Sequence, residues 1–510
     1  MEQRRSSIRL LLGLFAIAVA TRLPIRSGVL YTWDSVQYAL AMEHFDLAGH
    51  QPAPPGAFLY VMLARLFGFI LHNPNAVLGL MSIAASGVLV AALFELALVL
   101  TGRRAAAWAA FALTLSSPLI WQYGTVASIY VPDAAMAALF CLVCARIMRG
   151  EHGLWPLSSM ALAALAGFRP STALMLMPLW IMCIWQLPMR KIALAFILAA
   201  AATLAWAAPM VIITGGLARY LGAYDELYAF ALAPASPIRS GMPLAMNYAR
   251  VTLGYVHMGI GVGFVIALVH LILRPQESWR SIRSREGAFV LLMFAPYALG
   301  LIFIYNNPVD PGLTVALLPG LVIAMSAAWA GLLERRRYAR RVAAVVLAAV
   351  VAYNAHAFLI EPGASSLHFI RAQQGLVINY LRTVRAGFAP AETVLVGRYN
   401  LYFGPRHFMY YLPQYPVYIY DESIDEHGNP RQVMSCYERR TVMTDELILP
   451  ASVQSFVIQN LDKGLLYRLR PEEIAEVSEL RDQSGQTVGY SGPVGLLAKM
   501  LRPLEVRQSD

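Results

Sequence analysis

The sequence predicts an all-α polytopic membrane domain of about 11–13 transmembrane helices, followed by a soluble α/β domain on the external side of the membrane. Of the 510 residues, 58% are hydrophobic and only 14% are charged, whereas soluble globular proteins carry about 25% charged residues. Apolar runs of roughly 16–25 residues, long enough to cross a bilayer as helices, recur from Ile8 to Leu359. After residue 360 the composition becomes that of an ordinary soluble protein. We therefore expect two domains, residues 1–360 and 361–510.

The basic residues indicate how the spans alternate across the membrane. Arginine and lysine fall in short clusters between apolar runs, and such clusters mark the cytoplasmic side. We place the N-terminus inside, with Arg4, Arg5 and Arg9 at the start of an uncleaved first span, and each later cluster then falls at an inner loop or inner span end. The orientation of the spans in the membrane thus explains the net charge of +10, and the sequence contains no nucleic-acid-binding motif. The spans that we expect are 8–23, 76–100, 105–120, 131–148, 154–168, 171–187, 192–213, 249–273, 287–305, 313–333 and 342–360.

Residues 24–75 form the first external loop in this arrangement. Within this loop, the segment 57–72 (AFLYVMLARLFGFILH) is apolar enough to be a short span. A span at this place would reverse the orientation of every later loop and bring the basic clusters to the outside. We therefore expect 57–72 to lie in the membrane interface or to be re-entrant.

The C-terminal region alternates between strand-like and helix-like patterns, which predicts a small α/β domain with some parallel strands. It has no Gly-rich phosphate loop, metal-ligand cluster or nucleophile motif, so we expect it to serve recognition or positioning. Its aromatic stretch 399–420 could bind a glycan acceptor or pack on the membrane portion, and packing is the simpler role. The strand-like runs are 393–396, 417–420 and 455–459, and the helical patterns are 366–384 and 471–480.

Asp34 is the first acidic residue after the first span, and charge at a membrane edge is costly enough to indicate function. It opens a short amphipathic helix predicted over 34–47, and Gln37 and Tyr38 share its face at i+3 and i+4. Aspartate is also a favoured N-cap, so capping explains Asp34 by itself equally well. His50 follows in the same loop and, taken alone, is better explained as a satisfied polar residue near the interface.

Two more charged residues are expected at the same external face. Asp133 follows Pro132 at the start of a span, where a first-turn carboxylate also suits the helix dipole. Arg169, in GFRPST between two apolar runs, runs against the positive-inside trend; it could snorkel or bind a phosphate. Asp310 in NNPVDPG is explained by turn formation. Together, carboxylates and a cation at one membrane face indicate a site for an amphiphilic, phosphate-bearing substrate.

Over roughly the first 190 residues the chain resembles the GT-C superfamily of membrane glycosyltransferases, nearest the protein O-mannosyltransferase and lipid A aminoarabinose transferase branch. The resemblance rests on Asp34 in TWDSVQYA, just past the first span, and on QPAPPGAFLYVMLARLFG, a PPG-type turn that leads into an apolar helix. It continues in SSPLIWQYGTVASIYVPDA and GFRPSTALMLMP, in the same order and with similar spacings.

The resemblance implies an inverting enzyme that moves a sugar from a polyprenyl phosphate carrier to an acceptor hydroxyl at the external face. Asp34 would be the general base or would orient the acceptor nucleophile, and Arg169, His50 or a divalent cation such as Mg²⁺ or Mn²⁺ would stabilise the departing phosphate. Asp34 and Asp133 are the candidate ligands for such a metal. The other residues expected to contact substrate are Gln37, Tyr38, Tyr130 and Asp133.

The chain departs from the family pattern at two points. Relatives often place an acidic residue before a tyrosine in the second external link, where this chain has Ser128, Ile129 and Tyr130, with Asp133 only later. The lysine of a KPP-like turn is Ala53 here. Both departures leave the phosphate or metal ligands at those positions undefined.

Two other classes of protein remain as alternatives. One is a polytopic transporter or lipid-glycan flippase, although the two repeated halves with Gly- or Pro-interrupted spans that transporters often show are not evident. The other is an assembly or scaffolding protein whose C-terminal domain is the active part. The expected partners are a polyprenyl-linked sugar donor, a glycan, lipid or protein acceptor, and the bilayer. The arginine asymmetry and the resemblance favour a bacterial inner membrane, with the C-terminal domain periplasmic or extracellular.

Overall fold

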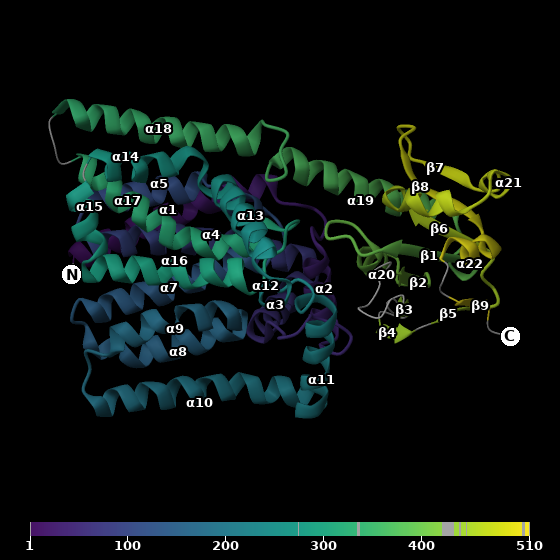
Figure 1. The fold of residues 1–510 in the computed structure, drawn as a ribbon, viewed down its shortest axis with the longest axis horizontal. Coiled ribbons are helices and arrows are strands. Elements are labelled where there is room, and N and C mark those ends of the chain that lie inside the picture. Colours follow the sequence, from purple (N-terminus) through teal and green to yellow (C-terminus); the bar gives the residue numbers. More distant parts are fainter. Residues whose placement is uncertain are drawn as a thin grey trace. The chain divides into compact units, whose positions relative to one another are not determined.

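The protein folds into two compact units, each built from two stretches of the chain. The computed structural model describes residues 2–508 apart from 274, 334–336, 421–432, 438–439, 445 and 502–504. The first unit, which we term the helical unit, comprises Met1–Ser27 and Pro54–Phe369. The second, termed the α/β unit, comprises Gly28–Ala53 and Ile370–Asp510. The mostly helical body and the C-terminal sheet confirm the predicted fold class (Figure 1).

The helical unit contains a helix at each of the eleven predicted spans. Proline and capping residues set many helix starts: Pro74 and Pro170 stand in the first turns of their helices, where the missing N–H is harmless, and Asn73 caps one of them through its side chain. The helices are α1 (Glu2–Arg22), α3 (Phe58–Leu71), α4 (Pro74–Thr101), α5 (Arg104–Ser116), α6 (Pro118–Thr125), α7 (Tyr130–Met148), α8 (Trp155–Phe168), α9 (Pro170–Ile184), α10 (Met189–Ile213), α11 (Leu217–Leu227), α12 (Pro237–Ser240), α13 (Met242–Ile260), α14 (Phe264–Leu273), α15 (Pro275–Ile282), α16 (Arg285–Phe303), α17 (Leu318–Leu333) and α18 (Arg337–Leu359).

Eight helical stretches in the described part of the chain are long and apolar enough to cross a membrane. The chain is therefore a multi-pass membrane protein. Helices α5, α8 and α9 have 13, 14 and 15 residues. At 1.5 Å per residue each is roughly 20–23 Å long, shorter than a hydrocarbon core of about 30 Å. That these three also span the membrane stays a prediction.

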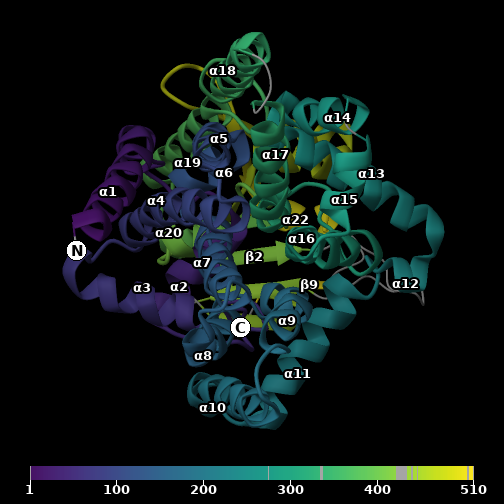
Figure 2. The same ribbon diagram turned by 90° about the vertical axis from the view of Figure 1, so that its left-hand side faces the viewer.

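Helices α4 and α7 form the interior of the helical unit, and α10 lies at its edge. Figure 2 looks along the helices and shows α7 between α4 and α9. Small residues allow the close packing of α4: a Cβ added to Gly87 would collide with the ring of Phe15 on α1. Most of α4 and α7 is buried, whereas α10 exposes nearly all of its apolar length. An apolar helix exposed in this way is suited to contact with lipid.

The predicted interfacial segment 57–72 forms α3. Its N-terminal half is buried, with Phe58 and Tyr60 packed into the helical unit, and its C-terminal half exposes Phe69 and Ile70. At 14 residues it is roughly 21 Å long. A short helix with one buried end and one exposed apolar end is compatible with the interfacial placement that we predict.

The α/β unit is built on a seven-stranded sheet with the order β4-β3-β2-β1-β6-β8-β7. The three central strands β2, β1 and β6 are parallel, and the others join in antiparallel pairs. These central strands confirm the three predicted ones, and their buried aliphatic and aromatic side chains contribute to the core of the unit. The strands are β1 (Thr393–Arg398), β2 (Val417–Tyr420), β3 (Val433–Tyr437), β4 (Arg440–Thr444), β6 (Ser455–Gln459), β7 (Ser478–Arg481) and β8 (Thr487–Pro493), with β5 (Glu446–Leu449) and β9 (Glu505–Gln508) paired separately.

Two of the predicted helices have different outcomes in this unit. Helix α19 (Leu367–Gly387) covers the pattern predicted at 366–384. The helix predicted at 471–480 is wrong beyond its first turn, because α21 (Pro471–Ile474) is followed by β7, which pairs with β8. Pairing at the sheet edge overrides the local helical pattern. A further helix, α20 (Pro405–Tyr411), follows β1 and carries an aromatic run.

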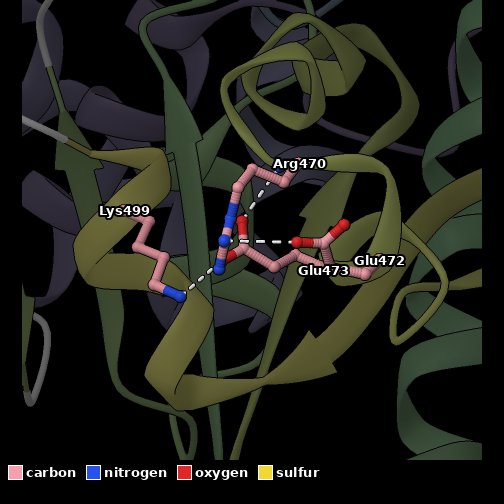
Figure 3. Close-up of polar contacts among 4 residues, drawn as sticks. All are labelled: Arg470, Glu472, Glu473 and Lys499. Atoms are coloured by element: carbon pink, nitrogen blue, oxygen red, sulfur yellow. Dashed lines mark hydrogen bonds and ion pairs between the residues drawn. The ribbon is translucent and has the colours of Figure 1, made fainter.

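Glu473 links the short helix α21 to Lys499 (Figure 3). Its carboxylate accepts from the backbone N–H and the guanidinium of Arg470, each at 2.9 Å, and forms an ion pair with Lys499. Lys499 lies in α22 (Leu497–Met500). Hydrogen bonds from Lys499 and Arg470 lower the pKa of Glu473 to about 2.

Candidate functional site

Asp133 lies in the first turn of α7, as predicted, and its side chain is fully buried. The hydroxyl of Thr172 donates a hydrogen bond to Asp133 Oδ2 at 2.7 Å, and Arg169 Nη1 lies 3.6 Å from the same oxygen. Asp133 Oδ1 has no hydrogen-bond partner in the described part of the chain. A buried carboxylate inside a membrane helix is costly unless its oxygens are satisfied. Asp133 Oδ1 is therefore a buried acceptor whose hydrogen-bonding capacity the described residues leave unused.

Arg169 lies at the junction between α8 and α9. Pro170 disfavours a helical conformation at the residue before it, and Arg169 is extended, with φ −149° and ψ 100°. Its guanidinium carbon lies 5.1 Å from the ring centroid of Tyr130, within the range of a cation–π contact. The side chain is only 15% exposed. This burial between Asp133 and Tyr130 favours a role inside the protein over snorkelling to the headgroups.

Asp310 extends the polar array from the other side of Tyr130. Its carboxylate accepts hydrogen bonds from the hydroxyls of Tyr123 and Tyr130, at 2.5 and 2.6 Å. It also accepts from the backbone N–H of Gly312 at 2.9 Å at the start of the short 3₁₀ helix Pro311–Leu317, which is the turn role that the sequence predicts. A Cβ on Gly312 would overlap the ring of Tyr130, so only glycine allows this approach.

Asp34 lies in the α/β unit, in the first turn of α2 (Trp33–Glu43), and its side chain is partly exposed. The N-cap of this helix is Thr32, whose hydroxyl accepts from the backbone N–H of Ser35 at 3.3 Å. Capping therefore does not explain Asp34, and that alternative is wrong. The helix begins one residue before the predicted start and ends four residues before the predicted end, because Asp46 and Gln51 pair as an isolated bridge that turns the chain.

The other residues predicted near Asp34 differ in exposure. Tyr38 lies one helical turn after Asp34 and is partly exposed, whereas Gln37 is buried. His50 is buried in the turn after α2, and burial lowers its pKa to about 4, with Arg406 lowering it further and Asp46 opposing the change. His50 is therefore neutral at pH 7. A neutral imidazole can donate or accept a hydrogen bond but cannot supply the positive charge that a leaving phosphate needs.

The structure groups the predicted residues within each unit. The helical unit brings Tyr130, Asp133 and Arg169 into one buried array, and α2 carries Asp34 with Tyr38 on its partly exposed side. Sequence reasoning missed Thr172 and Tyr123. Thr172 stands three residues after Arg169 in GFRPST, a signal that was available, whereas no local pattern links Tyr123 to Asp310 across 187 residues.

The described residues contain no group of three or more His, Cys, Asp or Glu side chains arranged to hold a metal ion. Asp133 has one buried neighbour of opposite charge, Arg169, where a metal site would gather further carboxylates or imidazoles.

No family model matches the sequence, and no curated protein matches it in sequence. Solved structures match its fold. ArnT from Cupriavidus metallidurans bound to undecaprenyl phosphate shares 12% identity with a TM-score of 0.57, over 95% of this chain and 97% of that one. ArnT in the apo state gives 10% identity and 0.56, over 96% and 98%. The oligosaccharyltransferase AglB from Archaeoglobus fulgidus, in complex with an inhibitory peptide and a dolichol-phosphate, gives 10% and 0.50, over 91% and 71%.

These matches show that the chain has the fold of ArnT and AglB over more than nine tenths of its length, whereas the resemblance carried by the sequence covers only its first part. Within that fold class, the two ArnT structures cover both the helical unit and the C-terminal sheet of this protein at nearly full length. At 10–12% identity the likeness establishes the fold. The activity has to be argued from the site.

Proposed function

We propose that this protein is an inverting glycosyltransferase that moves a sugar from a polyprenyl phosphate to a hydroxyl on an acceptor at the external face of the membrane. The observation that carries the proposal is the buried array of Asp133, Arg169 and Tyr130 inside a GT-C fold. An arginine held at the junction of α8 and α9, beside an acidic residue with one oxygen that makes no hydrogen bond to the described residues, suits a ligand that combines a phosphate with hydroxyl groups.

The proposed roles follow from the chemistry of the groups. Asp34 takes the proton of the acceptor hydroxyl, the acceptor oxygen bonds to the anomeric carbon from the face opposite the phosphate, and the bond between that carbon and the phosphate oxygen breaks. The polyprenyl phosphate leaves as an anion, which needs charge stabilisation rather than a proton. Arg169 supplies that charge, and Asp133 holds the guanidinium in place and accepts a hydrogen bond from the sugar or the acceptor.

The expected setting and partners follow from the same proposal. The donor is a polyprenyl phosphate sugar, and the acceptor is a glycan, a lipid or a protein with a free hydroxyl. The ArnT structure bound to undecaprenyl phosphate supports a lipid-linked donor of this kind. We place the protein in a bacterial inner membrane with its N-terminus cytoplasmic and its C-terminal region periplasmic or extracellular, in keeping with the positions of the basic clusters.

The test is transfer of labelled sugar by the purified full chain in lipid nanodiscs, supplied with a panel of polyprenyl phosphate sugars. Asp34→Asn removes the proposed base, and Glu43→Gln, at the exposed end of the same helix, is the matched control. We expect the wild type and Glu43→Gln to release polyprenyl phosphate. Loss of a general base slows catalysis by about 10²–10⁴-fold, so Asp34→Asn should be nearly inactive.

A second assay, with the protein in proteoliposomes that contain the same donors, separates the proposal from the transporter or flippase alternative. A flippase would move an intact lipid-linked sugar between leaflets of a proteoliposome without breaking the bond to phosphate. Donor turnover that is unchanged in Asp34→Asn contradicts the proposed base. Movement of intact donor with no cleavage of any lipid in the panel contradicts the transferase itself.

A further inference from the structure

Residues 28–53, which we term the docked segment, fold with the C-terminal region rather than with the helices that flank them in sequence. Helix α2 of this segment packs against α20. Three backbone N–H groups of the segment bond to C-terminal residues: Gly28 to the side chain of Gln374 at 2.9 Å, Leu30 to the hydroxyl of Tyr411 at 2.9 Å, and Trp33 to the carbonyl of Leu401 at 2.6 Å. The helix that carries Asp34 is therefore held by residues that lie more than 300 positions further along the chain.

Arg406, at the start of α20, contacts the docked segment at two distant points. Its Nη2 donates a hydrogen bond to the carbonyl of Gly49 at 3.0 Å, and its guanidinium carbon lies 5.6 Å from the ring centroid of Trp33. Trp33 is the first residue of α2 and directly precedes Asp34, whereas Gly49 lies in the turn beyond the end of the helix. One side chain thus links the start of α2 to the turn that follows it, and this fixes both the position and the direction of the helix.

The loop after β1 also contacts Trp33. The ring of Tyr399 packs edge-on against Trp33 with centroids 4.8 Å apart, and Tyr402 packs in the same way against Tyr31 at 5.4 Å. This loop follows directly from the central strand of the sheet. Tyr399, Tyr402 and Tyr411 of the aromatic stretch 399–420 thus contact the docked segment within the α/β unit, whereas the packing expected from the sequence was on the membrane portion.

Burying an arginine completely costs more desolvation free energy than burying an apolar side chain, so packing alone does not explain it. Arg406 is 0% exposed, and burying a guanidinium has a large desolvation cost unless its donors are used. An aliphatic residue of similar size would fill the space without that cost. The planar group of arginine can do what an aliphatic residue cannot: donate to a carbonyl while stacking on a ring.

We infer that Arg406 is a positioning residue for catalysis, through which the C-terminal sheet sets the placement of Asp34. The inference rests on the proposed function, because it takes Asp34 as the base. It assigns the C-terminal region a part in the reaction, since displacement of a reacting group by about 1 Å can cost about 10²-fold in rate.

The first test measures whether Arg406 stabilises α2 in its position, and it needs no substrate. Hydrogen–deuterium exchange is followed in residues 33–43 of the full-length protein for the wild type, Arg406→Ala and Arg468→Ala. Arg468 is the matched control, because it is an exposed arginine of the same unit that donates to a backbone carbonyl, that of Met500 at 3.0 Å. We expect exchange in α2 to rise at least about tenfold in Arg406→Ala and to stay unchanged in the control. Unchanged exchange in Arg406→Ala overturns the inference.

The second test is a kinetic cycle with Asp34→Asn. Arg406→Ala should lower kcat by about 10–100-fold with little change in the KM for donor, because it displaces the base and leaves the helical unit intact. In the Asp34→Asn background the same substitution should cost less than about threefold, because the base is already lost. An equal loss in both backgrounds shows that Arg406 does not act through Asp34 and overturns the inference.

The outcomes distinguish this inference from the proposed function. If Asp34→Asn turns over donor like the wild type, the base assignment fails, while the exchange measurement still decides whether Arg406 holds α2. If Asp34→Asn is inactive and Arg406→Ala is fully active, only the inference fails. Should Arg406→Ala not fold, Arg406→Lys serves in its place, because lysine keeps the charge but cannot donate to Gly49 and stack on Trp33 at once.

Discussion

Replacing Arg169 by glutamine is expected to destabilise the helical unit by about 3–5 kcal/mol, the cost of removing one partner from a buried ion pair. The substitution leaves Asp133 fully buried without its cation and bonded to Thr172 alone among the contacts described above. At the observed separation of 3.6 Å, the attraction in a medium of effective dielectric about 20 is about 5 kcal/mol, which is of the same order.

The opposite substitution should cost less. Asp133→Asn leaves Arg169 stacked on Tyr130 and partly open to solvent, so we expect a loss of about 1–3 kcal/mol. The double variant contains no unpaired charge at this place. Its loss should therefore be smaller than the sum of the two single losses, by about 1–3 kcal/mol. It should nevertheless remain inactive, because the cation for the phosphate is gone.

The assay is unfolding of the detergent-solubilised protein by added sodium dodecyl sulfate, followed by tryptophan fluorescence. Arg146→Gln is the control, because Arg146 pairs with Glu95 at 3.0 Å on a more exposed surface, where ion pairs contribute about 0–1 kcal/mol. Losses that simply add in the double variant would show that Arg169 and Asp133 do not interact energetically. A double variant that regains sugar transfer would refute the role of Arg169.

Three other outcomes can be checked with single variants. Gly312→Ala should displace the ring of Tyr130 and lower the thermal stability by about 1–3 kcal/mol, together with transfer activity; a stable, active variant would show that Tyr130 can move freely. Glu473→Gln should destabilise the α/β unit at pH 7 but not near pH 2. The pKa of Glu473 is lowered in the folded state, so its contribution is full above pH of about 4.5 and disappears as the pH falls toward 2. His50→Gln should make the α/β unit less sensitive to acid between pH 6.5 and 4, because the unfolded His50 takes up a proton there that the folded form does not; thermal melts across that range measure the difference.

Helix positions were predictable from the sequence because long apolar runs can satisfy their backbone groups in a membrane only as helices or closed barrels. The central strands β1, β2 and β6 were predictable because their apolar residues form short runs bounded by turn signals. The prediction for 471–480 failed because strand pairing with β8 overrides the local pattern, and no local signal reports a partner that lies elsewhere in the chain.

The candidate site could be predicted only in part. Asp34, Asp133 and Arg169 stood out because charge is rare in such a chain. The bonds of Asp310 to Tyr123 and Tyr130 could not be predicted, since tyrosines are common at membrane interfaces and nothing in the sequence marks these two. The role of Arg406 could not be predicted for the same reason, because arginines are common in soluble regions and the sequence does not show that this one is buried.

The division of the α/β unit between two distant stretches has a consequence for how the protein is made. Residues 28–53 leave the ribosome before residues 54–369 of the helical unit, and their partners follow roughly 300 residues later, which takes about 15–60 s at the usual rates of synthesis. Leu30, Tyr31 and Trp33 are all buried in the folded protein. During that interval the C-terminal residues that bury them have not yet been synthesised. A chain that stops before residue 370 can thus insert its helices and still leave this segment open to proteases and chaperones.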